Sequence, residues 1–82
     1  MNRVETFELI CEKVRDVVRL KGGHDQPLHT GTVLLGGVLP LDSLDLAGIL
    51  VELESATGKD PFLDGFIDFR TIGQLADLYS CP

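Results

Sequence analysis

The chain has no tryptophan, only four phenylalanines, one tyrosine and one methionine, and no continuous apolar stretch of about 18 residues. A membrane-spanning helix is therefore not expected. The opening residues 1–5 also lack the apolar core of a signal peptide. With 82 residues, 44% of them hydrophobic, the chain suffices for one domain over residues 1–82, with a core built mainly from Leu, Val and Ile. We expect a soluble, cytoplasmic monomer.

Cysteine is also scarce. Cys11 and Cys81 lie near opposite ends of the chain, a pattern typical of neither a disulfide framework nor a metal cluster. Cys11 falls among apolar residues at helical spacing, which favours a buried core position over a reactive thiol. His24 and His29 have no Cys or acidic cluster at ligand spacing. We interpret them as solvated loop residues and expect no metal site.

Basic residues almost disappear after residue 21. The net charge is −6, and residues 22–82 hold nine acids but only two bases. This distribution predicts a negative field that repels nucleic acid and favours partners with basic patches. The alternative is that the acidity only keeps a small domain soluble, which explains the total charge but not its asymmetry.

The spacing of apolar residues predicts a first helix and a long loop. From Val4 to Leu20 these residues recur at intervals of three and four, which is typical of an amphipathic helix. Gly22 and Gly23 end this helix. Residues 22–41 contain five glycines and two prolines without a sustained period, which indicates a loop that is unusually long for so small a domain.

Asp42 is placed to cap a second, leucine-rich helix. Asp45, three residues later, completes a box-like cap, so Ser43 falls in the first helical turn. Gly58 ends this helix.

Two further helical segments are expected in the last third of the chain. Residues 62–69 predict a short, irregular helical turn that holds most of the aromatic core, and Thr71 with Gln74 predicts a capped last helix. The expected fold is all-α, a small four-helix bundle with three main helices, one short third helix and a long loop between the first two helices.

Residues 39–46, Leu-Pro-Leu-Asp-Ser-Leu-Asp-Leu, carry the main functional signal. Here the chain resembles the acyl carrier protein family, whose attachment site is Asp-Ser-Leu at the start of the second of four helices. The resemblance extends over nearly the whole chain, including the preceding loop and the helix capped by Thr71. It implies a stand-alone, non-catalytic carrier. Ser43 would bear a 4′-phosphopantetheine arm from coenzyme A, on which acyl or aminoacyl groups ride as thioesters.

The position of Ser43 suits this role on physical grounds. The start of a helix offers unpaired N–H groups and the positive end of the dipole to a phosphodiester. The resemblance also implies brief docking of a phosphopantetheinyl transferase, a loading ligase or transferase, and a downstream synthase or acceptor enzyme. The residues expected to contact these partners are Asp42, Leu44, Asp45, Leu46, Glu52 and Glu54.

Several positions depart from typical fatty-acid carriers. Pro40 stands where that family commonly has Gly, Gly48 where an acidic residue is usual, and Thr57 where a large aromatic residue often fills the core. Gly48 indicates either close packing or a distinctive partner surface. Gly37 lies six residues before Ser43, too far for the Gly-Gly pattern of peptide-synthetase carriers. A specialised polyketide, fatty-acyl or aminoacyl pathway is therefore expected.

Three alternatives remain for the same segment. Ser43 could be a simple capping residue, although Asp42 already fills that position. A Ser-His-Asp hydrolase would use residue types that are present, but the Gly-x-Ser-x-Gly pattern is absent. An unmodified helical interaction module would bind a partner through its acidic second helix.

Overall fold

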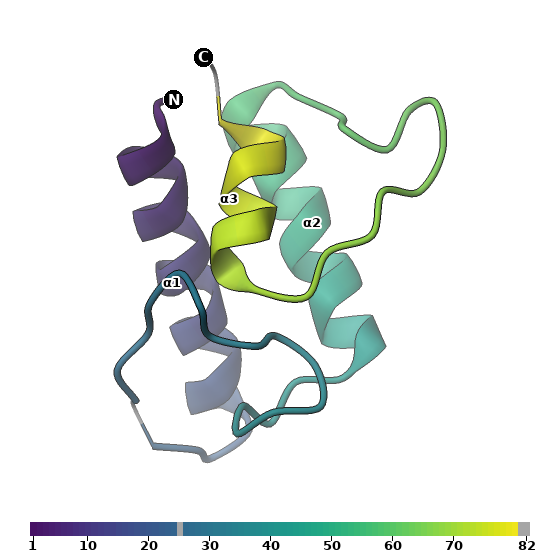
Figure 1. The fold of residues 1–82 in the computed structure, drawn as a ribbon. Coiled ribbons are helices and arrows are strands. Elements are labelled where there is room, and N and C mark those ends of the chain that lie inside the picture. The colour runs from purple at the N-terminus through teal and green to yellow at the C-terminus, as the bar shows by residue number, and fades with distance from the viewer. Residues whose placement is uncertain (25, 81–82) are drawn as a thin grey trace.

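Three helices make up the regular structure of residues 1–24 and 26–80, the part of the chain that the computed structural model describes. They are α1 (Arg3–Leu20), α2 (Ser43–Thr57) and α3 (Ile72–Tyr79). Figure 1 shows α1 running opposite to α2 and α3, and each helix contacts the other two. The all-α prediction is confirmed. None of the helices in the described residues is long and apolar enough to cross a membrane.

Reciprocal capping sets the start of each helix. The Asp42 side chain accepts a hydrogen bond from Asp45 N at 2.8 Å, and Asp45 Oδ2 accepts one from Asp42 N at 3.1 Å. Thr71 and Gln74 form the same arrangement at α3. Both predicted boxes are confirmed, and each satisfies backbone donors that a helix start leaves unpaired. A third box, which begins at Asn2, caps α1.

The core lies where the three helices meet and is mainly aliphatic. Its fully buried side chains include Ile10, Val14, Ile49, Leu53, Ile72 and Leu75. Cys11 is also buried, as predicted, with 4% of its surface exposed. Leu34, Leu39 and Leu41 close the core from the long loop.

The long loop is tied to the start of α3 by backbone hydrogen bonds. Leu34 N donates to Arg70 O at 2.9 Å and Ile72 N donates to Thr32 O at 3.0 Å, around an isolated antiparallel bridge. Gly73 N donates to Thr30 O at 2.9 Å. Segments about 40 residues apart in sequence thus lie side by side, and loop closure over this distance costs entropy that the bonds and the buried leucines offset.

The short third helix expected at 62–69 is not formed. Residues 61–64 make turns, with hydrogen bonds from Leu63 N to Asp60 O and from Gly65 N to Phe62 O, and residues 66–70 have no regular structure. Gly65 has a φ of 134°, which is incompatible with helix continuation. The described residues therefore contain three of the four expected helices.

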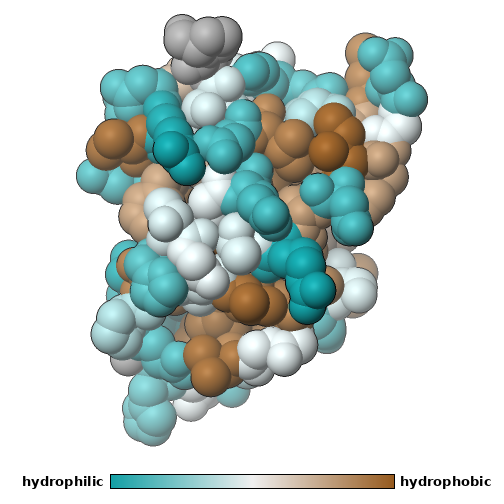
Figure 2. Space-filling model, viewed as in Figure 1, coloured by the Kyte–Doolittle hydropathy of each residue, from teal (hydrophilic) through white to brown (hydrophobic). Residues whose placement is uncertain are grey.

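The aromatic core predicted for this connection is found only in part. Phe66 is 74% exposed, and Phe62 and Phe69 are only partly buried. Tyr79 of α3, which is 2% exposed, is instead the aromatic residue of the core. Figure 2 shows apolar surface at the upper right, where Figure 1 places α2 and the connection to α3.

Candidate functional site

Ser43 is the first residue of α2 and is exposed to solvent. The backbone N–H groups of Ser43 and Leu44 make no hydrogen bond within the described residues, because the Asp42 cap takes only Asp45 N. Two free donors and the positive end of the helix dipole therefore lie beside the Ser43 hydroxyl. An anionic group attached there would gain hydrogen bonds without breaking any.

Lys21, just after α1, neutralises the carboxylates next to Ser43. Lys21 Nζ lies 3.6 Å from Asp42 Oδ2 and forms a closer ion pair with Asp45. The hydrogen bond to Lys21 holds the pKa of Asp45 below its ordinary value, and the same bond raises the pKa of Lys21. A new negative charge on Ser43 would thus meet compensated carboxylates, and the ion pairs also fix the start of α2 against the end of α1.

The two leucines expected to contact partners lie in different surroundings. Leu44 is 81% exposed, as expected for an apolar anchor that binds another protein. Leu46 is buried, with 9% of its surface exposed, and belongs to the core cluster. Leu46 therefore does not lie on the exposed docking face, because its position one turn into α2 points it inward.

The acidic residues expected at the docking face are only partly available. Asp45 has 20% of its side chain exposed and is engaged by the cap and by Lys21. Glu52 is exposed and lies 4.0 Å from Lys13 of α1, a weak contact. Glu54 is exposed and forms no ion pair with any described residue. Because nearby lysines neutralise part of the charge of these acids, α2 carries less free negative charge than the sequence suggested.

An apolar cleft opens beside Ser43, and we call it the Ser43 cleft. Its larger hollow, of about 340 Å³, lies between the long loop, α2 and the connection to α3. The residues that line it are Leu35, Ser43, Leu46, Ala47, Leu50, Phe66, Asp68 and Phe69. A smaller hollow of about 150 Å³ adjoins it and shares Leu35, Leu46 and Phe69. The cleft is large for so small a domain, and no pattern in the sequence predicted it.

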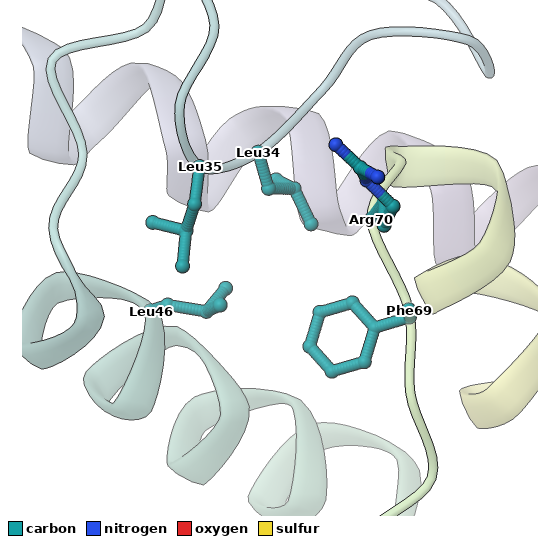
Figure 3. Close-up of a pocket in the computed structure, with 5 residues that line it drawn as sticks. All are labelled: Leu34, Leu35, Leu46, Phe69 and Arg70. Carbon is teal, nitrogen blue, oxygen red and sulfur yellow. The ribbon is translucent and has the colours of Figure 1, made fainter.

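Figure 3 shows how the smaller hollow is built. Leu34, Leu35, Leu46 and Phe69 point toward one another around it, and Arg70 lies at its edge. Phe69 is supported from outside by Phe66, with ring centroids 6.1 Å apart, and Phe66 stacks on Phe62 at 5.5 Å. These ring contacts stabilise a wall that lacks regular secondary structure.

Gly48 faces open solvent rather than a neighbouring helix. A Cβ atom built on Gly48 meets no atom within 4 Å. Close packing, one of the two interpretations of this glycine, is therefore wrong. The other interpretation, a distinctive partner surface, stays a prediction.

The remaining candidate residues lie apart from the site. Burial raises the pKa of the Cys11 thiol, which fits a core residue, whereas Cys81 lies outside the described residues. His24 and His29 are both exposed in the long loop, and His29 Nδ1 accepts a hydrogen bond from Gly31 N at 3.0 Å. Within residues 1–24 and 26–80, no three His, Cys, Asp or Glu side chains gather as metal ligands would.

Lys21 and the Ser43 cleft are the two features that sequence reasoning missed. The sequence contains a weak signal for Lys21, because a base near the end of the first helix interacts favourably with the helix dipole. It contains no signal for the cleft, because the walls of the cleft come from three segments whose contact no local pattern encodes.

In comparisons with known proteins, no protein-family model, no curated protein and no solved structure matches the chain.

Proposed function

We propose that the protein is a carrier of the acyl carrier protein type, in which Ser43 bears a 4′-phosphopantetheine arm. The observation that carries the proposal is the setting of Ser43. Its exposed hydroxyl stands at the start of α2, next to two free backbone N–H groups and at the edge of an apolar cleft. In this proposal, the connection over residues 61–70 takes the place of the short third helix of a four-helix carrier bundle.

The residues around Ser43 suit attachment of the arm. The Ser43 oxygen forms a bond to the phosphorus that carries pantetheine in coenzyme A, and the pyrophosphate bond breaks with release of adenosine 3′,5′-bisphosphate. The hydroxyl proton passes to a base of the transferase. The free N–H groups of Ser43 and Leu44 then face a phosphodiester, which helix starts bind well. The bound arm supplies the thiol that forms thioesters.

Leu44 is the proposed contact for the enzymes that modify, load and unload the carrier in the cytoplasm. Its side chain is 81% exposed and lies one residue from Ser43, where an enzyme that acts on the arm would cover it. Asp42, Glu52 and Glu54 surround this anchor with partly compensated negative charge. Weak and exchangeable docking is expected, because one carrier must serve several enzymes in turn.

A second candidate function is an interaction module that is never modified. Leu44 and Val51 are both largely exposed on α2, and this apolar surface would serve such a module equally well. The apolar hollow lined by Ser43 favours the carrier, because a docking face that is never modified has no need of a hollow at this serine.

Intact-protein mass spectrometry tests the proposal. The protein is incubated with coenzyme A and a promiscuous phosphopantetheinyl transferase, beside Ser43→Ala and the matched control Ser55→Ala, which alters an exposed serine of the same helix. We expect the parent and Ser55→Ala to gain one phosphopantetheine and Ser43→Ala to gain none. No gain by the parent, under conditions that modify a control carrier, would overturn the carrier proposal and leave the interaction module.

A further inference from the structure

The two hollows of the Ser43 cleft differ in charge. Asp68 lines the larger hollow, which Ser43 also lines, and Arg70 lines the smaller one. The walls between them are the apolar side chains of Leu35, Leu46 and Phe69. The larger hollow thus carries an acid and the smaller one a base, and both come from the same stretch of the connection to α3.

The guanidinium group of Arg70 is unpaired within the described part of the chain. No hydrogen bond or ion pair joins it to another described residue, whereas Arg3, Lys13 and Lys21 all have acidic partners. The backbone of Arg70 is held firmly, because its N–H donates to Gln74 Oε1 at 2.7 Å and its carbonyl accepts from Leu34 N. A fixed backbone with a free side chain is suited to binding an anion at the edge of the hollow.

From this arrangement we infer that the Ser43 cleft selects acyl chains that end in a carboxylate, with Arg70 as the specificity-determining residue. The inference rests on the proposed carrier function. The apolar walls cover the methylene groups, and the guanidinium donates paired hydrogen bonds to the terminal carboxylate. The negative charge of Asp68 disfavours the same carboxylate in the larger hollow, so the carboxylate binds in the smaller one.

The size of the cleft limits the length of the chain. The hollows measure about 340 Å³ and about 150 Å³. Since a water molecule occupies about 30 Å³ of liquid and a methylene group is similar in size, they have room for at most about sixteen carbons, and a chain of about eight carbons fits within them. A chain that ends in a methyl group would fill the same space but leave Arg70 without a partner.

The test uses two free probes and the unmodified protein, so it does not depend on attachment of the arm. Monomethyl octanedioate has an ester at one end and a carboxylate at the other, whereas dimethyl octanedioate is neutral. Both are titrated while the NMR signals of Arg70 Nε–H and of the Leu34 and Leu46 methyl groups are followed. We expect the monoester to bind about tenfold more tightly than the diester, as a hydrogen-bonded charge pair predicts. Added salt should reduce this preference.

Variants separate Arg70 from general charge effects. In Arg70→Gln, the monoester and the diester should bind about equally. Binding of the diester should stay as in the parent protein, because only the charged contact is lost. Arg15→Gln removes the same charge from α1, outside the cleft, and should keep the preference. Asp68→Asn should increase it. Equal binding of both probes by the parent protein, or an unchanged preference in Arg70→Gln, would overturn the inference.

The carrier proposal and this inference fail in different ways. If the transferase does not modify Ser43, the carrier function falls, whatever the free probes show. If Ser43 is modified, arms loaded with octanedioyl and octanoyl groups are compared. The inference then expects a shift of the Arg70 Nε–H signal for the octanedioyl arm alone, and shifts of equal size would overturn it.

Discussion

Two glycines in the helices should respond in opposite directions to the same substitution. Gly48 lies in the middle of α2, where an added Cβ meets nothing within 4 Å. Gly73 lies in the first turn of α3, where an added Cβ would stand 2.8 Å from Thr30 O and 2.9 Å from Thr30 Cβ. An alanine at this position would therefore push the long loop and the start of α3 apart.

The magnitudes follow from these surroundings. Gly48→Ala should raise the free energy of unfolding by about 0.5–1 kcal/mol, because alanine loses less backbone entropy in a helix. Gly73→Ala should lower it by about 1–3 kcal/mol, as expected for overpacking against a backbone atom. The hydrogen bond from Gly73 N to Thr30 O, 2.9 Å long, would also be weakened. Together the two variants should differ by about 1.5–4 kcal/mol.

Urea denaturation followed by far-UV circular dichroism measures both changes. The midpoint should move up for Gly48→Ala and down for Gly73→Ala, with similar slopes, because the surface exposed on unfolding barely changes. In thermal scans each kcal/mol should shift the Tm by about 4–8 °C. A destabilised Gly48→Ala protein would refute the open surroundings of α2. An unchanged Gly73→Ala protein would refute the close contact of the loop with α3.

Two further predictions concern titratable groups. Because Asp45 has its pKa lowered from 3.8 by Lys21, this ion pair stabilises the fold fully above pH 3.8 and its contribution is lost as the pH falls through the lowered value. Lys21→Met should therefore reduce stability by a constant amount near neutral pH and by less in strong acid, while Lys13→Met changes little; an effect independent of pH would contradict this. Burial raises the pKa of Cys11, so in a Cys81→Ser background its thiol should react with a disulfide reagent far more slowly in the native protein than in urea. Equal rates would place Cys11 at the surface.

The sequence alone predicted the features that depend on neighbouring residues. Capping by Asp42 and Thr71 is specified within four residues, and the amphipathic period of α1 correctly placed Cys11 in the core. The exposure of Leu44, by contrast, was expected only from the resemblance to acyl carrier proteins. The setting of Ser43 at a helix start could therefore be predicted without a structure.

The tertiary structure decided what depends on residues far apart in the chain. A short helical turn was expected in the connection over residues 61–70, but Gly65 and the contacts of its phenylalanines leave it without a helix. Gly48 and Gly73 look alike in sequence, and only the approach of Thr30 distinguishes them. The pairing of Lys21 with Asp45 and the walls of the Ser43 cleft also join distant segments. Such contacts arise from packing of the whole chain, whereas helix caps and the spacing of apolar residues depend on neighbours within about one helical turn.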